Sequence, residues 1–184
     1  MNIQNFLQRI WYQYIKKRRP QTVRIASKIR KSQKRFLAEH GAQYVYPPDK
    51  FSEITHTFNP PYILEIGFGN GDHIIQLAVA HPDKTIIGVE LYPLGIARSM
   101  KIAHQKQLKN ICVVQGDVRD VLDHVRPNSL QRVYILYPDP WRKKKHYKRR
   151  LVNSEFVRDV MKLITPGGEC VLATDWESYA EQMS

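Results

Sequence analysis

The sequence lacks several features that would assign it to common classes of protein. It contains only two cysteines, Cys112 and Cys170, both in apolar segments and far apart in the chain. We therefore expect buried thiols of a cytoplasmic protein and not a disulfide-stabilised secreted domain. No apolar run approaches the roughly 18 residues of a membrane span, so we expect no stable membrane anchor. The seven histidines show no paired metal-ligand spacing, and we expect no metal site.

Acidic residues are missing from two stretches of the chain. Residues 1–38 contain eleven Lys or Arg and no Asp or Glu, and residues 142–150 contain seven Lys or Arg and no acid. The rest of the chain holds the other 11 basic residues and all 17 acidic residues. A net charge of +12 that is segregated in this way favours a polyanionic partner, and nucleic acid fits better than a membrane surface.

The N-terminal part differs in pattern from the rest of the chain. Residues 3–15 place apolar side chains at helical spacing, which predicts an amphipathic helix. This helix would dock on the body of the protein or, alternatively, lie on a membrane surface. We therefore divide the chain into a basic extension, residues 1–40, and one domain, residues 41–184. Proline pairs in YVYPPDK and TFNPPY predict loops at the start of that domain.

From Tyr62 onward, short apolar runs alternate with segments of helical pattern. Five such alternations predict parallel strands joined by right-handed crossovers, and hence an α/β fold with a Rossmann-like, doubly wound, mostly parallel sheet. We expect strands at 62–69, 85–90, 111–117, 131–138 and 169–175, and helices at 72–82, 93–108, 118–126, 153–164 and from 176 onward.

A carboxylate lies at the end of each of these five strands. Ligands of doubly wound sheets bind beyond the carboxyl ends of the strands, where the strand order reverses. The sequence therefore predicts one polar, anionic crevice, formed by Glu65, Glu90, Asp117, Asp139 and Asp175.

The segment EIGFGNG predicts the kind of cofactor in this crevice. Its G-x-G-x-G spacing differs from the G-x-G-x-x-G of dinucleotide sites, and Glu65 would repel a pyrophosphate. S-adenosylmethionine (AdoMet) carries positive charge and no phosphate, so it fits better. Glu90 is placed to accept from both ribose hydroxyls, and Asp117 from the adenine amino group. A nicotinamide-dependent oxidoreductase is the alternative. The glycines that would approach the cofactor are Gly67, Gly69 and Gly71.

The segment YPDPWRKKKHYKRR joins a restrained acid to the densest basic run. Pro138 and Pro140 restrict the backbone on both sides of Asp139, which ends the fourth strand beside the expected methyl group. Trp141 either packs the loop or stacks on a base. The basic run offers contacts to several phosphates through Arg142, Lys143, Lys144, Lys145, Lys148, Arg149 and Arg150, with His146 as a phosphate or backbone contact.

Three segments, EIGFGNG, YPDPWRKKKHYKRR and ATDWESYAEQM, resemble the bacterial tRNA (guanine-N7-)-methyltransferases of the TrmB type, over about residues 62–184. The resemblance implies an AdoMet-dependent class I methyltransferase that forms 7-methylguanosine at position 46, in the variable loop of tRNA. It implies AdoMet contacts for Glu65, Glu90, Asp117 and Asp139, a catalytic role for Asp139, and substrate contacts for Lys143 and Asp175. We expect RNA contacts from Lys144, Lys145, His146, Lys148, Arg149 and Arg150.

The end of the chain departs from that family. Its members continue past the last helix through two more strands, so we expect a domain that is incomplete at its C-terminus and lacks the last two strands of the sheet. Impaired stability and reduced activity would follow, because the fifth strand would lie at an open edge. A tRNA-binding or RNA-binding module that no longer catalyses is the alternative, and both a monomer and a homodimer remain open.

Overall fold

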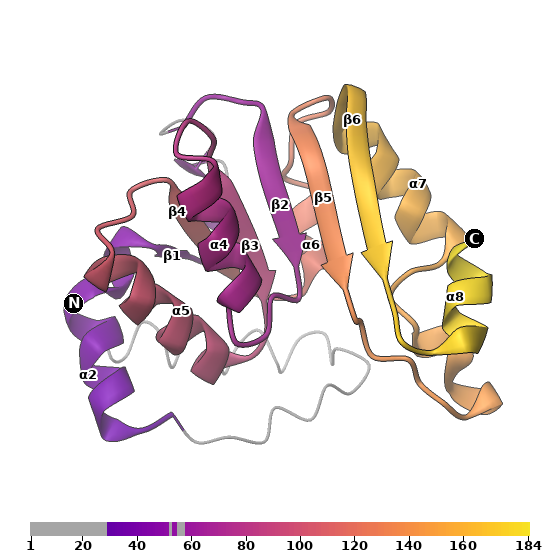
Figure 1. Cartoon of the computed structure of the whole chain (residues 1–184), viewed down its shortest axis with the longest axis horizontal. Helices are drawn as coiled ribbons and strands as arrows, with labels where there is room; N and C mark the ends of the chain where they lie inside the picture. Colours follow the sequence, from indigo (N-terminus) through magenta and orange to yellow (C-terminus); the bar gives the residue numbers. More distant parts are fainter. Residues whose placement is uncertain (1–28, 52, 55–57) are drawn as a thin grey trace.

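The computed structural model describes residues 29–184, apart from residues 52 and 55–57, and the helix predicted at residues 3–15 lies outside this part. Its strands form a six-stranded sheet in the order β1-β4-β3-β2-β5-β6, and every neighbouring pair is parallel. Helices cover both faces (Figure 1). The strand order reverses between β2 and β5, so the predicted doubly wound α/β fold is confirmed.

The elements follow the expected alternation. The strands are β1 (Val45–Tyr46), β2 (Tyr62–Ile66), β3 (Ile86–Glu90), β4 (Ile111–Gln115), β5 (Leu130–Leu136) and β6 (Ile164–Ala173). The α-helices are α2 (Lys31–His40), α4 (Asp72–Ala80), α5 (Pro93–Gln105), α6 (Val118–Leu122), α7 (Ser154–Leu163) and α8 (Glu177–Met183), and the 3-10 helices are η1 (Gly41–Gln43), η2 (Pro48–Lys50) and η3 (Lys144–Arg149).

Local sequence signals explain where several helices begin. Pro93 occupies the first turn of α5, where its missing N–H costs nothing. The side chain of Asn153 caps α7 by accepting a hydrogen bond from Phe156 N at 3.0 Å.

An apolar cluster lies on each face of the sheet. Ile74 of α4 and Met100 of α5 belong to the first cluster, and both are fully buried. Val121 of α6, Phe156 of α7 and Tyr179 of α8 belong to the second. The helices of the two clusters lie in front of and behind the sheet in Figure 1. Burial on both faces explains why β2 is a continuous apolar run with a single acid, and not an alternating one.

The structure differs most from the predicted elements in three places. The segment YVYPPDK contains a short strand, because Val45 and Tyr46 pair with β4 before the prolines end the pairing. Strand β6 begins at Ile164, which already pairs with β5, and residues 165–168 bulge out before pairing resumes at Glu169. Helix α6 ends at Leu122, four residues earlier than expected.

Helix α2 is packed on the body of the protein. Leu37 is buried, Phe36 packs against the cluster formed with α5, and the imidazole rings of His40 and His104 stack at 4.2 Å. The boundary expected at residue 40 would assign α2 to the basic extension. In the structure, however, α2 packs against α5 of the domain.

Candidate functional site

A cavity of about 270 Å³ lies at the carboxyl ends of β2, β3, β4 and β5. Four of the predicted cofactor residues line it: Gly67, Glu90, Asp117 and Asp139. The other three, Glu65, Gly69 and Gly71, are their neighbours in the chain and do not line the cavity. The structure thus brings together residues from four strand ends at the expected edge of the sheet.

The glycine loop has a backbone that only glycine adopts without strain. Gly67, Gly69 and Gly71 have φ angles of +73°, +55° and +83°. Gly71 precedes the first turn of α4, and its N–H donates to Phe68 O at 2.9 Å. The loop therefore turns sharply from β2 into α4 beside the cavity.

Helix α5 holds this loop in place through residues that the sequence did not single out. A Cβ on Gly95 would overlap the carbonyl oxygen of Gly69, so glycine permits this close approach. Arg98 donates to Asn70 O at 2.6 Å and to Asp72 Oδ1 at 2.8 Å. A glycine inside the helical pattern of 93–108 was the available signal for Gly95.

Glu90 fastens the glycine loop to the end of β3. Its Oε2 accepts from Gly69 N at 2.7 Å, and its Oε1 accepts from Leu91 N at 2.6 Å and Tyr92 N at 2.9 Å. Burial raises the pKa of the Glu90 carboxyl; these N–H donors oppose the shift, and the nearby charge of Asp139 adds to it. The charge of Asp139, in the loop after β5, therefore acts on Glu90 of β3 across the cavity.

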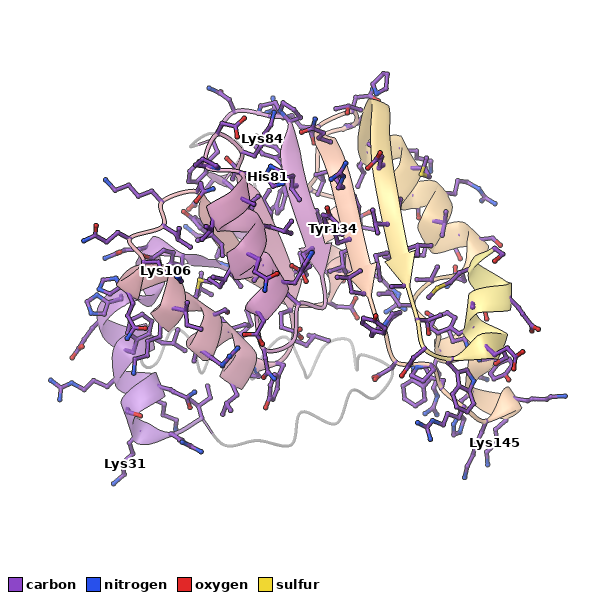
Figure 2. All side chains as sticks on the ribbon, in the orientation of Figure 1. Lys31, His81, Lys84, Lys106, Tyr134 and Lys145 are labelled. Atoms are coloured by element: carbon purple, nitrogen blue, oxygen red, sulfur yellow. The ribbon has the colours of Figure 1, made fainter. Side chains whose placement is uncertain are left out.

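Glu65 is a buried carboxylate with an unsatisfied oxygen. Its side chain is 3% exposed, and its Oε2 lies 3.2 Å from His73 Nδ1 without forming a hydrogen bond. Burial raises the pKa of Glu65, and His73 opposes that shift. The ring of Tyr134, labelled on β5 in Figure 2, packs edge-on against His73 at 4.9 Å. Sequence analysis had missed His73, which comes from α4.

Asp117 caps α6 at the cavity wall. Its Oδ1 accepts from Arg119 N at 3.0 Å, and its Oδ2 lies 3.3 Å from Arg119 Nη1. Arg119 also lines the cavity, so a positive charge accompanies the acid there. The sequence contained this pair two residues apart, but nothing in it indicated that the guanidinium turns back towards Asp117.

The Pro-Asp-Pro loop is held in an unusual conformation. Tyr137 and Trp141, on either side of it, have φ angles of +52° and +46°, which are uncommon for bulky residues. Tyr137 N donates to Ala173 O of β6 at 2.8 Å, while the Tyr137 side chain is 67% exposed at the cavity. Asp139 is exposed between them. The exposed Tyr137 is a further site residue that sequence analysis overlooked.

Trp141 packs within its own loop. Its ring meets that of His146 edge-on at 5.8 Å, and the guanidinium of Arg149 lies 5.0 Å from the ring centroid. Trp141 and Arg149 both line the cavity. Of the two alternatives for Trp141, packing is the arrangement observed.

The basic run presents most of its charge to solvent. Figure 2 places Lys145 at the end of the molecule towards which the strands point, and Lys31 of α2 at the same end on the other side. Burial and the neighbouring positive charges lower the pKa of His146. The exposed members of the run are Arg142, Lys143, Lys144, Lys145 and Lys148.

Arg150 differs from the rest of the run. It is 1% exposed, and its guanidinium donates to oxygens of Pro140, Ser178 and Gln182. A side chain enclosed in this way cannot reach an RNA phosphate, so the predicted RNA contact of Arg150 does not agree with the structure. The sequence could not separate it from its neighbour Arg149, because both belong to one uninterrupted basic run.

The two predicted substrate residues lie outside the cavity wall. Asp175 is exposed in the turn between β6 and α8, and Lys143 is exposed just before η3. Lys143 follows β5, whose carboxyl end contributes to the cavity, and Asp175 follows the neighbouring edge strand β6.

The described part of the chain shows neither a metal-ligand cluster nor a membrane-spanning helix. Within residues 29–184, as far as they are described, no group of three or more His, Cys, Asp or Glu side chains could hold a metal ion. In the same part of the chain, no helix is long and apolar enough to cross a membrane.

Comparison with known proteins identifies close relatives. A family model described as "Putative methyltransferase" matches residues 59–184. The tRNA (guanine-N(7)-)-methyltransferase of Thiobacillus denitrificans is 38% identical over 162 residues, which cover 86% of this chain and 71% of that protein. The protein of the same name from Nitrosococcus oceani is 48% identical, over 66% of this chain and 52% of the relative. The first curated relatives are longer: the chain covers 61%, 54% and 57% of three of them.

Solved structures support the fold. An antibiotic-resistance methyltransferase, Kmr, superposes with a TM-score of 0.51 at 16% identity, over 76% of this chain and 73% of that one. A 30S ribosomal A1408 methyltransferase from an uncultured bacterium gives a TM-score of 0.51 at 14% identity, over 68% and 59% of the two chains.

Proposed function

The chain belongs to the tRNA (guanine-N7-)-methyltransferase family, and from this premise we propose that it transfers the methyl group of AdoMet to N7 of a guanosine in tRNA. The proposed target is the guanosine at position 46 of the variable loop, and the product is 7-methylguanosine. A nicotinamide-dependent oxidoreductase is not favoured by these relatives. The proposal assigns residues 41–184 to the methyltransferase domain, acting on tRNA in the cytoplasm.

One observation carries this proposal: the cavity is lined by three carboxylates, Glu90 at the end of β3, Asp117 just after β4 and Asp139 in the loop after β5. AdoMet has a positively charged sulfonium and amino group and no phosphate, so such a wall suits it. The unsatisfied Oε2 of buried Glu65 is a further acceptor beside the glycine loop. Glu65, Glu90 and Asp117 would hold the cofactor, whose bound sulfonium supplies an electrophilic methyl group.

The other substrate needs little chemical activation. Guanine N7 carries a lone pair and no proton, so no general base is required. The N7 lone pair would form the bond to the methyl carbon as the carbon–sulfur bond breaks. The electron pair of the carbon–sulfur bond would stay on sulfur. Most of the rate enhancement should then come from alignment.

Asp139 stabilises the positive charge that moves onto the purine. It also accepts hydrogen bonds from guanine N1–H and the N2 amino group, with Asp175 assisting at the base edge. Pro138 and Pro140 limit the motion of Asp139, which keeps the carboxylate oriented before the base arrives.

Exposed charges beside this site would bind the tRNA backbone. Lys145 lies at the end of the molecule towards which the strands point (Figure 2). Lys143, Lys144 and Lys148 are exposed in the same run, with His146 and Arg149 among them. Neutralising several phosphates releases counterions, so tRNA affinity should fall steeply with salt concentration.

The direct test is incubation of the chain with tRNA and AdoMet labelled on its methyl group, followed by nucleoside mass spectrometry. Labelled 7-methylguanosine at position 46 is the expected result. Salt-sensitive tRNA binding without methyl transfer would instead identify an RNA-binding module. A rise in melting temperature with AdoMet and not with NAD is expected, because a ligand stabilises the folded state that binds it.

A further inference from the structure

We propose that Arg150 is a positioning residue for methyl transfer, which fixes the loop of Asp139 against α8, and that it makes no contact with RNA. This inference rests on the proposed function and deepens it. Arg150 belongs to the basic run in the sequence, but its side chain is buried, whereas most side chains of that run are exposed.

The guanidinium of Arg150 joins the Pro-Asp-Pro loop to α8. Its Nε donates to Pro140 O at 2.9 Å. Its Nη1 donates to Ser178 O at 2.8 Å and to Gln182 Oε1 at 2.9 Å, and its Nη2 donates to Ser178 Oγ at 2.9 Å. Four of its five N–H groups are therefore engaged, in a planar arrangement that the ammonium group of lysine cannot reproduce.

The surroundings of Arg150 suit a charge that stays inside the protein. The acceptors are carbonyl, amide and hydroxyl oxygens, and the rings of Tyr147 and Tyr179 lie 3.6 Å and 4.7 Å from Cζ. A buried charge is costly unless hydrogen bonds and favourable dipoles compensate it. Releasing Arg150 to an RNA phosphate would leave these acceptors unsatisfied.

The same cluster fastens the chain on both sides of Arg150. Tyr179 OH accepts from Val152 N at 2.9 Å, and Gln182 Nε2 donates to Val152 O at 2.7 Å. The hydroxyl groups of Tyr147 and Ser178 lie 3.1 Å apart. Helix α8 is thus tied to the segment that follows η3.

These ties connect the supports of two proposed base-binding carboxylates. Pro140 directly follows Asp139, and α8 begins two residues after Asp175. Arg150 donates to the carbonyl of Pro140 and to Ser178 and Gln182 of α8. It therefore sets the distance between the two acids, and an error of about 1 Å in such positions can reduce a rate about 10²-fold.

The test compares Arg150→Lys, which keeps the charge and loses the fork, with Lys148→Gln, which removes an exposed charge of the same run. For Arg150→Lys we expect single-turnover methyl transfer at saturating tRNA and AdoMet to fall by about 10²-fold. Its tRNA affinity, the salt dependence of that affinity and its AdoMet affinity should match those of the wild type. For Lys148→Gln we expect weaker tRNA binding and a salt slope lower by about one.

A second variant covers the case in which Arg150→Lys fails to fold. Ser178→Ala removes one acceptor of the guanidinium and keeps the charge, and it should lower the same single-turnover rate by a smaller factor. Rates are normalised to the folded fraction from a melting curve. The inference is overturned if the normalised rates of the folded variants equal the wild-type rate, or if Arg150→Lys lowers the salt slope as Lys148→Gln does. Absence of 7-methylguanosine with the wild type would instead overturn the proposed function.

Discussion

The two halves of the site use carboxylates in opposite ways. On the cofactor side, Glu65 is buried and Glu90 accepts from three backbone N–H groups, so the protein itself orients these acids. On the proposed acceptor side, Asp139 and Asp175 are exposed, and the restraint falls instead on the backbone around Asp139, which Pro138 and Pro140 flank. A site can thus be preorganised either through the functional group or through its support. In the proposed function the exposed acids are free to meet a base, and in our inference Arg150 holds their supports.

Removing the charge of Asp139 should have the largest effect, and it should impair methyl transfer without impairing cofactor binding. Asp139→Asn should lower the rate of methyl transfer by about 10²–10³-fold, because an oriented charge beside the purine is lost. AdoMet binding should persist, since Glu65, Glu90 and Asp117 are unchanged. Single-turnover rates and calorimetric titration with AdoMet measure the two quantities. Near-normal turnover would contradict the proposed role of Asp139 in methyl transfer.

Glu90→Gln tests the cofactor half in the same way. An amide has one acceptor oxygen, so the N–H of Gly69 or those of Leu91 and Tyr92 lose their partner. The amide also has one acceptor fewer for the ribose hydroxyls. A hydrogen bond to a charged group contributes about 1.5–3 kcal/mol, so its loss should weaken AdoMet affinity roughly 10- to 100-fold. Asp83→Asn, at an exposed position far from the cavity lining, is the control and should bind AdoMet normally. An unchanged affinity for Glu90→Gln would contradict this account of the loop.

Gly95→Ala tests whether α5 supports the glycine loop. The added Cβ would overlap the carbonyl of Gly69, and the required shift should cost about 1–3 kcal/mol of unfolding free energy. Gly41→Ala is the matched control. Its Cβ would lie 3.6 Å from Leu37 in ordinary contact, at a φ of −61°, so it should stabilise the protein by about 0.4–1 kcal/mol. Urea denaturation measures the free energy of unfolding of both variants. Equal values would show that the close approach of Gly95 to Gly69 does not constrain the residue at position 95.

The pH dependence of stability gives the smallest expected effect, and its sign is fixed. Burial raises the pKa of Glu65 in the folded protein above its ordinary value of 4.5. Between pH 4.5 and the raised pKa, the folded state binds more protons than the unfolded state. The free energy of unfolding therefore falls as the pH rises through that window. The side chain introduced by Glu65→Gln does not titrate. The free energy of unfolding of this variant, relative to that of the wild type, should therefore increase as the pH rises through the same window. Denaturation curves from pH 4 to pH 8 measure this difference, and an opposite trend would contradict the assigned environment of Glu65.

Sequence patterns predicted most of the fold and of the cofactor side. Strands β2 to β5 are short apolar runs with an acid at or within three residues of their carboxyl ends, and the strand order of a doubly wound sheet brings such ends together. The glycines of EIGFGNG mark a turn with positive φ angles, which the structure confirms. Local chemistry at these positions is strong enough to determine local structure.

The remaining features depend on contacts between segments far apart in the sequence. Arg150 directly follows η3, and its partners Ser178 and Gln182 come from α8. The pairing of Ile164 with β5 likewise depends on a bulge at residues 165–168, after which pairing resumes at Glu169. No local pattern contains this information, because the deciding neighbours are chosen by the tertiary fold.

The structure of the chain bound to S-adenosylhomocysteine, the product of methyl transfer, tests the central claim most directly. We predict the ribose hydroxyls at Glu90, the adenine amino group at Asp117 and the sulfur facing Asp139 across the cavity lined by Gly67. Binding at another edge of the sheet, or a sulfur that points away from the Pro-Asp-Pro loop, would contradict the account of a cofactor half and an acceptor half that meet at Asp139.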